Sequence, residues 1–503
     1  MPALAELIAQ GRPVEVHRPW RRVIVTPQTC TAIAGEMAAG RATLLGLWGD
    51  EGAVHMAVLD EGMRDIAVVT VECPRGSFPS VGVLHPPAIR LERAILSLYG
   101  LEPIGAPDTR PWIDLGFWGV RHPLGPCAPA PPTPPAYQFL AAEGEGLHQI
   151  PVGPVHAGII EPGHFRFTAN GESVVRLEQR LGYVHKGIEA LMRGATIEKA
   201  TRLATHTSGD SAVAYALAFV QAVEAALSVA VPQRARYLRA LMAELERLAN
   251  HFGDIGAICN DASFAIMHAH CSVLREQILR VADSCFGHRL MMDRIVVGGI
   301  TTDISADDLA HLRSVLREIG QRFSDLLELY DNTTSLLDRT VGTGIVLPEL
   351  ARQFGAGGYV GRASGRDFDA RKQPGYAPYD QLEFTSPVLT AGDVNARLLV
   401  RTREVEQSLA LIKQIARRLP GGAVANSFVA ANGVSEGLGL VEGFRGDILA
   451  WVRLDGDRVA RCHLRDPSWF QWPLLEAAIE GNIVADFPLC NKSFNCSYSG
   501  HDL

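Results

Sequence analysis

Nine cysteines are the residues of this chain best suited to bind a redox metal, but their spacing does not form a metal site. Most iron–sulfur and structural zinc sites use Cys-x-x-Cys pairs, and no such pair occurs in the sequence. The two nearest cysteines, Cys490 and Cys496, are separated by five residues and have no second pair to complete a ligand set. We therefore expect no iron–sulfur or zinc site carried by this chain alone.

The composition is typical of a soluble, folded protein with more than one domain. The chain has 503 residues and a mass of 54.4 kDa, which predicts about two to four domains. Apolar residues make up 47% and charged residues 20%. The net charge of −8, without a basic block, argues against nucleic-acid binding. The N-terminus shows no signal-peptide pattern, so we expect reduced thiols and a cytoplasmic location.

One apolar stretch, Ser211 to Val231, is about long enough to cross a bilayer. It carries Gln221 and Glu224 near its middle, and such polar groups are costly in lipid. We interpret the stretch as a buried core helix. The chain is then predicted to have no direct transmembrane span and to reach a membrane only through partner subunits.

A proline-rich segment divides the sequence. Seven prolines lie within the thirteen residues from Pro123 to Pro135, and such a run forms neither helix nor central strand. It is typical of a stiff, extended spacer. We therefore predict an N-terminal domain over 1–122, a linker over 123–147 and a large domain over 148–503.

The N-terminal domain has an α/β pattern. Val54–Leu59 and Ile66–Val71 are strand-like runs separated by a turn, which predicts a hairpin. A helix with an apolar side follows and is expected to end at Gly100.

The rest of the chain is predicted to be mainly helical, with small sheets. Ser305 and Asp308 have the spacing of a helix cap, and the segments 447–454 and 459–464 are predicted to form a hairpin. The glycine-rich segment Gly355–Gly365 lacks the spacing of a nucleotide site, so a mobile or ligand-lining loop is expected there.

Two segments of the large domain resemble the large subunits of group 4, energy-converting nickel–iron hydrogenases. Gly187–Ile–Glu–Ala–Leu–Met–Arg–Gly194, followed by Ser208–Gly–Asp–Ser211, is similar to the family's Gly-Ile-Glu-Lys-Leu-Met helix and its Cys-Gly-Ile-Cys motif. The C-terminal stretch Ser493–Leu503 lies over the family's Asp-Pro-Cys-x-x-Cys-x-x-Arg.

The four cysteine positions of that resemblance hold Ser208, Ser211, Ser497 and Gly500. A serine hydroxyl does not ionise near neutral pH and is a poor ligand for soft transition metals, whereas thiolate suits them. The resemblance therefore implies a hydrogenase-like scaffold that binds no nickel, with no metal ligand expected in this chain.

The order of further landmarks is also similar to that of the forty-nine-kilodalton subunit of respiratory complex I. The N-terminal domain resembles the thirty-kilodalton subunit of complex I, a module that group 4 hydrogenases often carry ahead of the large subunit. The landmarks of the large domain are Gly153–Pro–Val–His156, Glu161–Pro–Gly–His164, Tyr183–Val–His–Lys–Gly187, Pro232–Gln–Arg–Ala–Arg–Tyr–Leu–Arg239, Glu244–Leu–Glu–Arg–Leu–Ala–Asn–His251 and the C-terminal tail from Asp486 to Asp502. Those of the N-terminal domain are Leu91–Glu–Arg93, Tyr99–Gly–Leu101 and Gly105–Ala–Pro–Asp–Thr–Arg–Pro–Trp112.

The resemblance also implies where protons and small molecules would be handled. Glu161 matches the glutamate that serves hydrogenases as a proton gateway, and a buried carboxylate with a raised pKa can pass protons. Asp210 lies between the two serines and is a second candidate. Alternatively, Glu161 accepts backbone hydrogen bonds and Asp210 caps the helix after Ser211.

The quinone contacts of complex I are not visible, because they fall at Pro162 and Gly209. A quinone remains a candidate ligand if other residues, such as His156, His206 or Tyr215, bind it.

We therefore expect an α+β protein in the large-subunit position of a membrane-associated complex, either hydrogenase-related or akin to NADH:quinone oxidoreductase. The implied partners are an iron–sulfur small subunit, similar to the twenty-kilodalton subunit of complex I, and antiporter-like membrane subunits at the inner face of the cell membrane. The alternatives are a non-catalytic structural subunit and a quinone oxidoreductase subunit. The residues expected around the former metal cavity are Glu161, His164, Ser208, Asp210, Ser211, Tyr215, Ser497 and His501.

Overall fold

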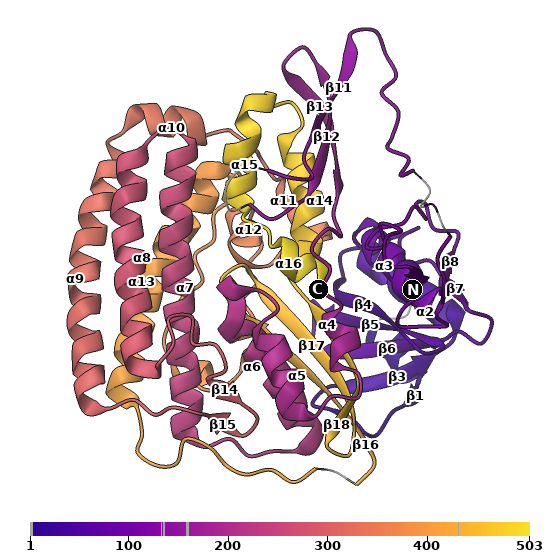
Figure 1. Ribbon diagram of the computed structural model, residues 1–503, viewed down its shortest axis with the longest axis horizontal. Helices are drawn as coiled ribbons and strands as arrows, with labels where there is room; N and C mark the ends of the chain where they lie inside the picture. Colours follow the sequence, from indigo (N-terminus) through magenta and orange to yellow (C-terminus); the bar gives the residue numbers. More distant parts are fainter. Residues whose placement is uncertain (1–3, 132, 134–135, 157–159, 431) are drawn as a thin grey trace.

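The computed structural model describes residues 4–131, 133, 136–156, 160–430 and 432–503. A layer of long helices forms one side of the molecule, and a strand-rich region built largely from the N-terminal residues forms the other (Figure 1). Smaller sheets and the C-terminal helices lie between them. The predicted α+β class is confirmed.

The N-terminal region contains a five-stranded sheet in the order β1-β3-β6-β5-β4. β5 and β6 are antiparallel neighbours, so the predicted hairpin is confirmed. The predicted helix is also present and is capped by Gly100. The elements are α1 (Leu4–Ala9), β1 (Arg12–Pro13), β3 (Arg21–Val25), α2 (Pro27–Ala38), β4 (Ala42–Asp50), β5 (Ala53–Asp60), β6 (Ile66–Glu72), β7 (Ser77–Pro79), α3 (Ile89–Tyr99) and β8 (Glu102–Ile104).

A segment with few regular elements connects this region to the rest. It contains the two-residue strands β9 (Val120–Arg121) and β10 (Ala128–Pro129), which pair with each other. Three of the prolines in the predicted linker, Pro132, Pro134 and Pro135, lie outside the described residues. A three-stranded antiparallel sheet follows, made of β11 (Leu147–Val152), β12 (His164–Asn170) and β13 (Ser173–Arg180).

A second large sheet joins the two ends of the chain. Its order is β18-β17-β16-β2, and the short N-terminal strand β2 lies parallel to β16. β17 and β18 form the hairpin predicted around Asp455–Asp457. Trp48 of β4 packs against Trp451 of β17, with ring centroids 5.7 Å apart. The bounds are β2 (His17–Arg18), β16 (Val434–Glu442), β17 (Asp447–Asp455) and β18 (Arg458–Arg465).

The helical layer is built around the long helices α7, α8, α9 and α13, which run side by side (Figure 1). The hydroxyl of Ser305 accepts a hydrogen bond from the Asp308 amide at the start of α9, as the capping pattern predicts. The remaining elements are α4 (Ile188–Met192), α5 (Ile197–Thr205), α6 (Ala212–Leu227), α7 (Gln233–Asp261), α8 (Ala265–Phe286), β14 (Ile295–Val296), β15 (Gly299–Ile300), α9 (Ala306–Asp331), α10 (Thr334–Thr340), α11 (Pro348–Gln353), α12 (Gly358–Ala363), α13 (Val394–Arg418), α14 (Ser468–Ile479), α15 (Phe487–Phe494) and α16 (Tyr498–Asp502).

The apolar stretch after Ser211 forms α6, which packs against β16 and β17. Within the described residues, Gly209–Leu227 is the one helical stretch long and apolar enough to cross a membrane, and 72% of that window is buried inside the protein. The interpretation as a core helix agrees with this burial.

The glycine-rich segment is not the mobile or ligand-lining loop that its composition predicts. Gly358–Ala363 forms the buried helix α12. A Cβ atom at Gly358 would lie 1.9 Å from the carbonyl oxygen of Arg445, and its φ is +60°. The glycine is needed because two backbone segments pack in contact there.

A chain of buried charges links α7, α13 and the end of β16. Arg362 of α12 lies between two carboxylates, bonding Glu404 at 2.6 Å and Glu442 at 2.9 Å. Arg371 continues the chain by bonding Glu244 at 3.0 Å. Buried ions need such partners because they have lost their hydration.

Candidate functional site

The candidate site lies where the turn before α6 meets the turn before α16. A single 3-10 turn, Gly209–Ser211, places Ser208 and Ser211 beside Asp210. The tail brings Ser497 to the same place, and its Oγ lies 3.4 Å from the Oγ of Ser208. The fold therefore gathers the three serines predicted from the sequence, and all three are buried.

Asp210 organises the serines through its carboxylate. Its Oδ1 accepts hydrogen bonds from Ser208 at 2.7 Å and from Ser211 at 3.1 Å. Arg445 donates to both carboxylate oxygens and also to the hydroxyl of Ser211 at 3.2 Å. This ion pair places a guanidinium against the serine cluster.

The protonation of Asp210 follows from these contacts. Burial alone would raise its pKa, but the charge of Arg445 and the hydrogen bonds from Arg445, Ser208 and Ser211 outweigh burial and hold the pKa well below its usual range. Asp210 is therefore an ionised partner of Arg445 rather than a group that exchanges protons near neutral pH. It is a half-buried ion-pair acceptor, with 34% of its side chain exposed.

Gly500 is the residue that the resemblance places at the fourth ligand position, and a neighbouring pair of side chains leaves no room there for a side chain. The hydroxyl of Tyr215 donates to Oδ2 of Asp466 at 2.7 Å. A Cβ at position 500 would lie 2.5 Å from that oxygen and 2.7 Å from the tyrosine hydroxyl. Burial, followed by the charge of Asp466, raises the pKa of Tyr215 well above its usual value, so the phenol is neutral.

Glu161 does not have the burial expected of a proton carrier. Its side chain is exposed. One carboxylate oxygen accepts hydrogen bonds from the backbone N–H and the hydroxyl of Ser499, each at 3.2 Å. This is the alternative arrangement, in which Glu161 accepts a backbone hydrogen bond and holds the C-terminal tail.

The histidines predicted for the site are engaged elsewhere. His501 bonds Asp502 at 2.8 Å and accepts from the indole of Trp112 at 3.2 Å. Burial lowers its pKa, although Asp502 opposes the shift. His164 lies at the start of β12, where Nδ1 is 3.2 Å from the carbonyl oxygen of Gly153, and burial lowers its pKa.

The three residues proposed for a quinone do not converge. His156 bonds the carbonyl oxygen of Gly163 at 2.8 Å. His206 lies at the end of α5 and bonds Asp293 at 3.2 Å, with more than half of its side chain exposed. The hydroxyl of Tyr215 is bound to Asp466 as described.

Sequence reasoning missed three groups of this site. Arg445 and Asp466 complete the two pairs described above, and Glu246 of α7 accepts from the backbone N–H groups of Val213 and Ala214 at the start of α6. Burial raises the pKa of Glu246 to about 8, with the charge of Asp210 adding to the effect. A small cavity of about 110 Å³ is lined by both Glu246 and Asp210. Glu246 is therefore the nearby carboxyl that titrates near neutral pH.

The side chains that meet at the site offer oxygen atoms and a guanidinium group rather than thiols. The nearest cysteine in sequence, Cys496, is buried, and burial raises the pKa of its thiol above the usual range. In the part of the chain that the structure describes, no group of three or more His, Cys, Asp or Glu side chains is arranged to hold a metal ion.

Comparison with known proteins places these features in context. The family profile described as "Respiratory-chain NADH dehydrogenase, 49 Kd subunit" matches residues 261–432. Formate hydrogenlyase subunit 5 of Escherichia coli (strain K12) is 31% identical over 445 residues, which cover 86% of this chain and 78% of the relative. The NADH-quinone oxidoreductase C/D protein of Phocaeicola vulgatus is 28% identical over 439 residues, covering 82% of this chain and 84% of the relative.

A solved structure shows the same fold. A chain from the structure of the membrane-bound sulfane sulfur reductase, described as an archaeal respiratory membrane complex, aligns with a TM-score of 0.67 and 25% identity. The alignment covers 72% of this chain and all of the other.

Proposed function

Because this chain belongs to the family of complex I forty-nine-kilodalton subunits and nickel–iron hydrogenase large subunits, we propose that it is a member in which ion pairs replace the nickel–iron cluster. The chain is a large subunit of the complex I or energy-converting hydrogenase type. In this proposal it binds no nickel. It couples electron transfer in a partner iron–sulfur subunit to antiporter-like membrane subunits at the inner face of the cell membrane.

The observation that carries the proposal is the way in which the four ligand positions are filled. Three are serines that bond one another or Asp210. The fourth, Gly500, faces the Tyr215–Asp466 pair with no room for a side chain. Nickel needs soft donors, so this oxygen-rich, closed arrangement does not fit the nickel–iron cluster.

The closed site favours a conformational role over turnover of a small molecule. A binding site is concave and keeps a few polar groups free for its ligand, whereas Arg445, Tyr215 and the serines are already bonded to neighbouring groups of the protein. A change of charge on a neighbouring cluster would act on the Asp210–Arg445 pair and on Glu246, whose raised pKa makes it the group that exchanges a proton.

The N-terminal region supports a further part of the proposal. The C/D protein of Phocaeicola vulgatus matches over most of both chains. This match is in keeping with a module like the thirty-kilodalton subunit of complex I, fused ahead of the hydrogenase-like part. The quinone alternative is less favoured, since the residues suggested for it bond other groups.

The test is to purify the complete membrane complex and to measure nickel and iron per copy of this chain. We expect iron from the partner subunit and nickel far below one equivalent. Nickel at one equivalent would overturn the proposal. To separate coupling from a purely structural role, Asp210→Asn is compared with wild type in a redox titration of the partner cluster. Coupling predicts a shifted midpoint potential in assembled complexes, and an unchanged potential would indicate a structural subunit.

A further inference from the structure

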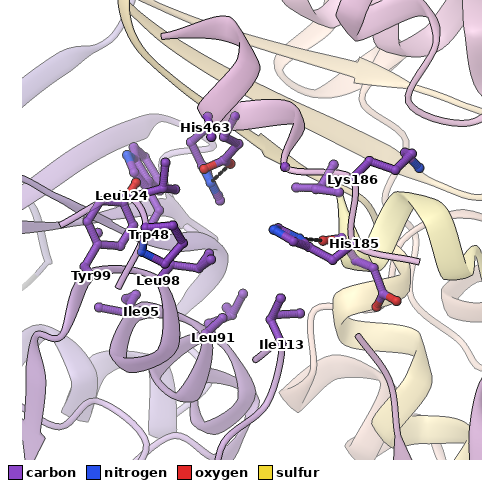
Figure 2. A pocket seen from close by; sticks show the side chains of 18 of the residues that line it. Trp48, Leu91, Ile95, Leu98, Tyr99, Ile113, Leu124, His185, Lys186 and His463 are labelled. Carbon is purple, nitrogen blue, oxygen red and sulfur yellow. Dashed lines mark hydrogen bonds and ion pairs between the residues drawn. The ribbon is translucent and has the colours of Figure 1, made fainter. Parts of the chain in front are cut away.

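The cavity between the N-terminal region and the large domain presents mainly apolar surface. Figure 2 shows Leu91, Ile95 and Leu98 of α3 along it. Two polar atoms of its lining residues, Nε2 of His463 and the hydroxyl oxygen of Tyr99, have almost no exposed surface and are closed off from a molecule in the cavity. Such a lining selects no particular ligand.

A groove on the outside of the helical layer has a different character, because cations line both of its sides. It lies between α13 and α9, the helix at the outer edge of the layer (Figure 1). Its volume is about 820 Å³. Arg313 of α9 donates to the carbonyl oxygen of Ala416 at 2.5 Å, and Gly320 lies beside Leu409. The two helices therefore run antiparallel along the groove.

Each helix contributes two cations that are one turn apart. The pair on α9 is Arg313 and Arg317, and the pair on α13 is Lys413 and Arg417. Residues four apart on a helix lie on the same face, about 5–6 Å from each other. No Asp or Glu lines the groove. In the part of the chain that the structure describes, none of these four cations forms an ion pair with a carboxylate.

The end of α13 accounts for only part of this arrangement. The last carbonyl groups of a helix carry partial negative charge, and Arg313 and Arg417 lie beside them. Arg317 and Lys413 lie about one turn further from that end, where the effect has faded. Four unpaired cations along one groove, in a chain of net charge −8, indicate a partner that supplies negative charge.

The floor of the groove is apolar and open enough to receive another element. Leu316 and Leu409 are half-buried and Ile412 is buried, so they lie beneath the exposed cations. A Cβ atom at Gly320 would contact only Leu409, at 3.7 Å. An apolar strip with charged flanks is a surface that receives an amphipathic helix. A membrane site would expose large apolar side chains beside its cations, and none of the residues that line this groove does so.

We propose that this groove binds an acidic amphipathic helix of a partner protein. The apolar ridge of that helix would lie on Leu316 and Leu409. Asp or Glu side chains on both flanks, four residues apart, would face the two pairs of cations. The proposal rests on the groove alone and is independent of the serine cluster and of the metal content.

The test uses the purified full-length chain and two labelled peptides of about 20 residues, long enough to form a helix. The first carries leucines on one face and glutamates on both flanks of that face, and the second has glutamine in place of every glutamate. Binding is measured by fluorescence anisotropy. We expect the acidic peptide to bind roughly tenfold more tightly than the glutamine peptide, and its affinity should fall as salt is added.

Two variants separate the groove from general attraction between charges. Arg317→Glu combined with Lys413→Glu should abolish binding of the acidic peptide. Its matched control, Arg75→Glu combined with Lys199→Glu, makes the same change of charge at exposed residues outside the groove and should leave the affinity within about twofold of the wild type. Ala410→Trp keeps every cation but fills the groove from the exposed face of α13, and it should also abolish binding.

Equal affinities of the two peptides for the wild type would overturn the proposal. So would undiminished binding of the acidic peptide to Ala410→Trp, because the groove would then not be the binding site. Binding to phosphatidylserine vesicles without binding to the acidic peptide would overturn it in favour of a membrane. A dimer of the wild type that is lost on reversal of Arg317 and Lys413, again without peptide binding, would overturn it in favour of a second copy of the chain.

Discussion

The hydroxyl of Tyr215 donates a hydrogen bond to Oδ2 of Asp466 at 2.7 Å, inside the space that a side chain at position 500 would occupy. Both residues are buried. Position 500, which the resemblance aligns with the last cysteine of the hydrogenase motif, is thus shaped by a polar pair.

This contact predicts that Gly500→Ala destabilises the protein. The added methyl group would overlap the Tyr215–Asp466 pair, and overpacking of this kind costs about 1–3 kcal/mol. Thermal unfolding followed by circular dichroism measures the effect. Gly35→Ala is the control, because Gly35 is also helical and has nothing within 4 Å of the new Cβ. Equal unfolding temperatures for the two variants would contradict the predicted clash.

Removing the charge of Asp210 should destabilise the candidate site. Asp210→Asn leaves Arg445 buried without its carboxylate partner. Loss of a fully buried partner costs about 3–5 kcal/mol, but Asp210 is one-third exposed, so we expect about 1–3 kcal/mol after allowing for solvent screening. Ser211→Ala removes only one bond to the same carboxylate and should have a smaller effect.

The acid dependence of that effect has a definite sign. The pKa of Asp210 is lowered in the folded protein, so its stabilisation is fully present above the unfolded pKa of about 3.9 and is lost as the pH falls through the folded pKa. The difference in stability between wild type and Asp210→Asn should therefore stay constant above about pH 5 and shrink in stronger acid. Urea unfolding at several pH values measures this difference, and a constant difference down to the lowest pH would disprove the ionised assignment.

Glu246 should give the opposite pH dependence. Its pKa is raised from 4.5 to about 8, so the folded state holds a proton that the unfolded state releases. The stability of the wild type relative to Glu246→Gln should then fall as the pH rises from about 5 to 8, because only the wild type must release the proton of this carboxyl. The exposed Glu318→Gln is the control and should retain the wild-type slope. The measurement is the unfolding temperature of each protein between these pH values.

Replacing the buried Arg362 should strongly destabilise the protein. Arg362→Met leaves Glu404 and Glu442 without their shared cation, and breaking such a buried pair costs about 3–5 kcal/mol. Arg322→Met removes an exposed pair with Glu318 and should change stability by less than about 1 kcal/mol. Comparable unfolding temperatures for the two variants would refute the structural role of Arg362.

Local patterns in the sequence were sufficient to predict the elements that depend only on residues close together in the chain. The hairpin around Asp60–Gly62 and the cap at Ser305 depend on residues a few positions apart. Burial of α6 followed from Gln221 and Glu224 within an apolar run. The family motif also predicted that Ser208, Ser211 and Ser497 lie at one site, and the structure places them together.

The partners of those serines had no such local signal. Arg445 is 234 residues from Ser211, and no spacing relates it to the serine motif. The resemblance implied a buried, proton-carrying Glu161, and the alternative was an acceptor of backbone hydrogen bonds; its exposed side chain accepts from the Ser499 N–H, which agrees with the alternative. The glycines near Gly358 indicated freedom of movement, whereas in the structure they allow backbone segments to touch.

The pairing of β2 with β16 has a consequence for the order in which the chain acquires its structure. β2 leaves the ribosome well before its neighbour β16, since Glu436 of β16 follows its salt-bridge partner Arg22, on β3, by 414 residues. At a synthesis rate of about 5–20 residues per second, β16 is synthesised roughly 20–80 seconds after β2. During that interval Trp48 also lacks Trp451, so the nascent chain displays an unpaired strand and an uncovered indole that a chaperone can recognise.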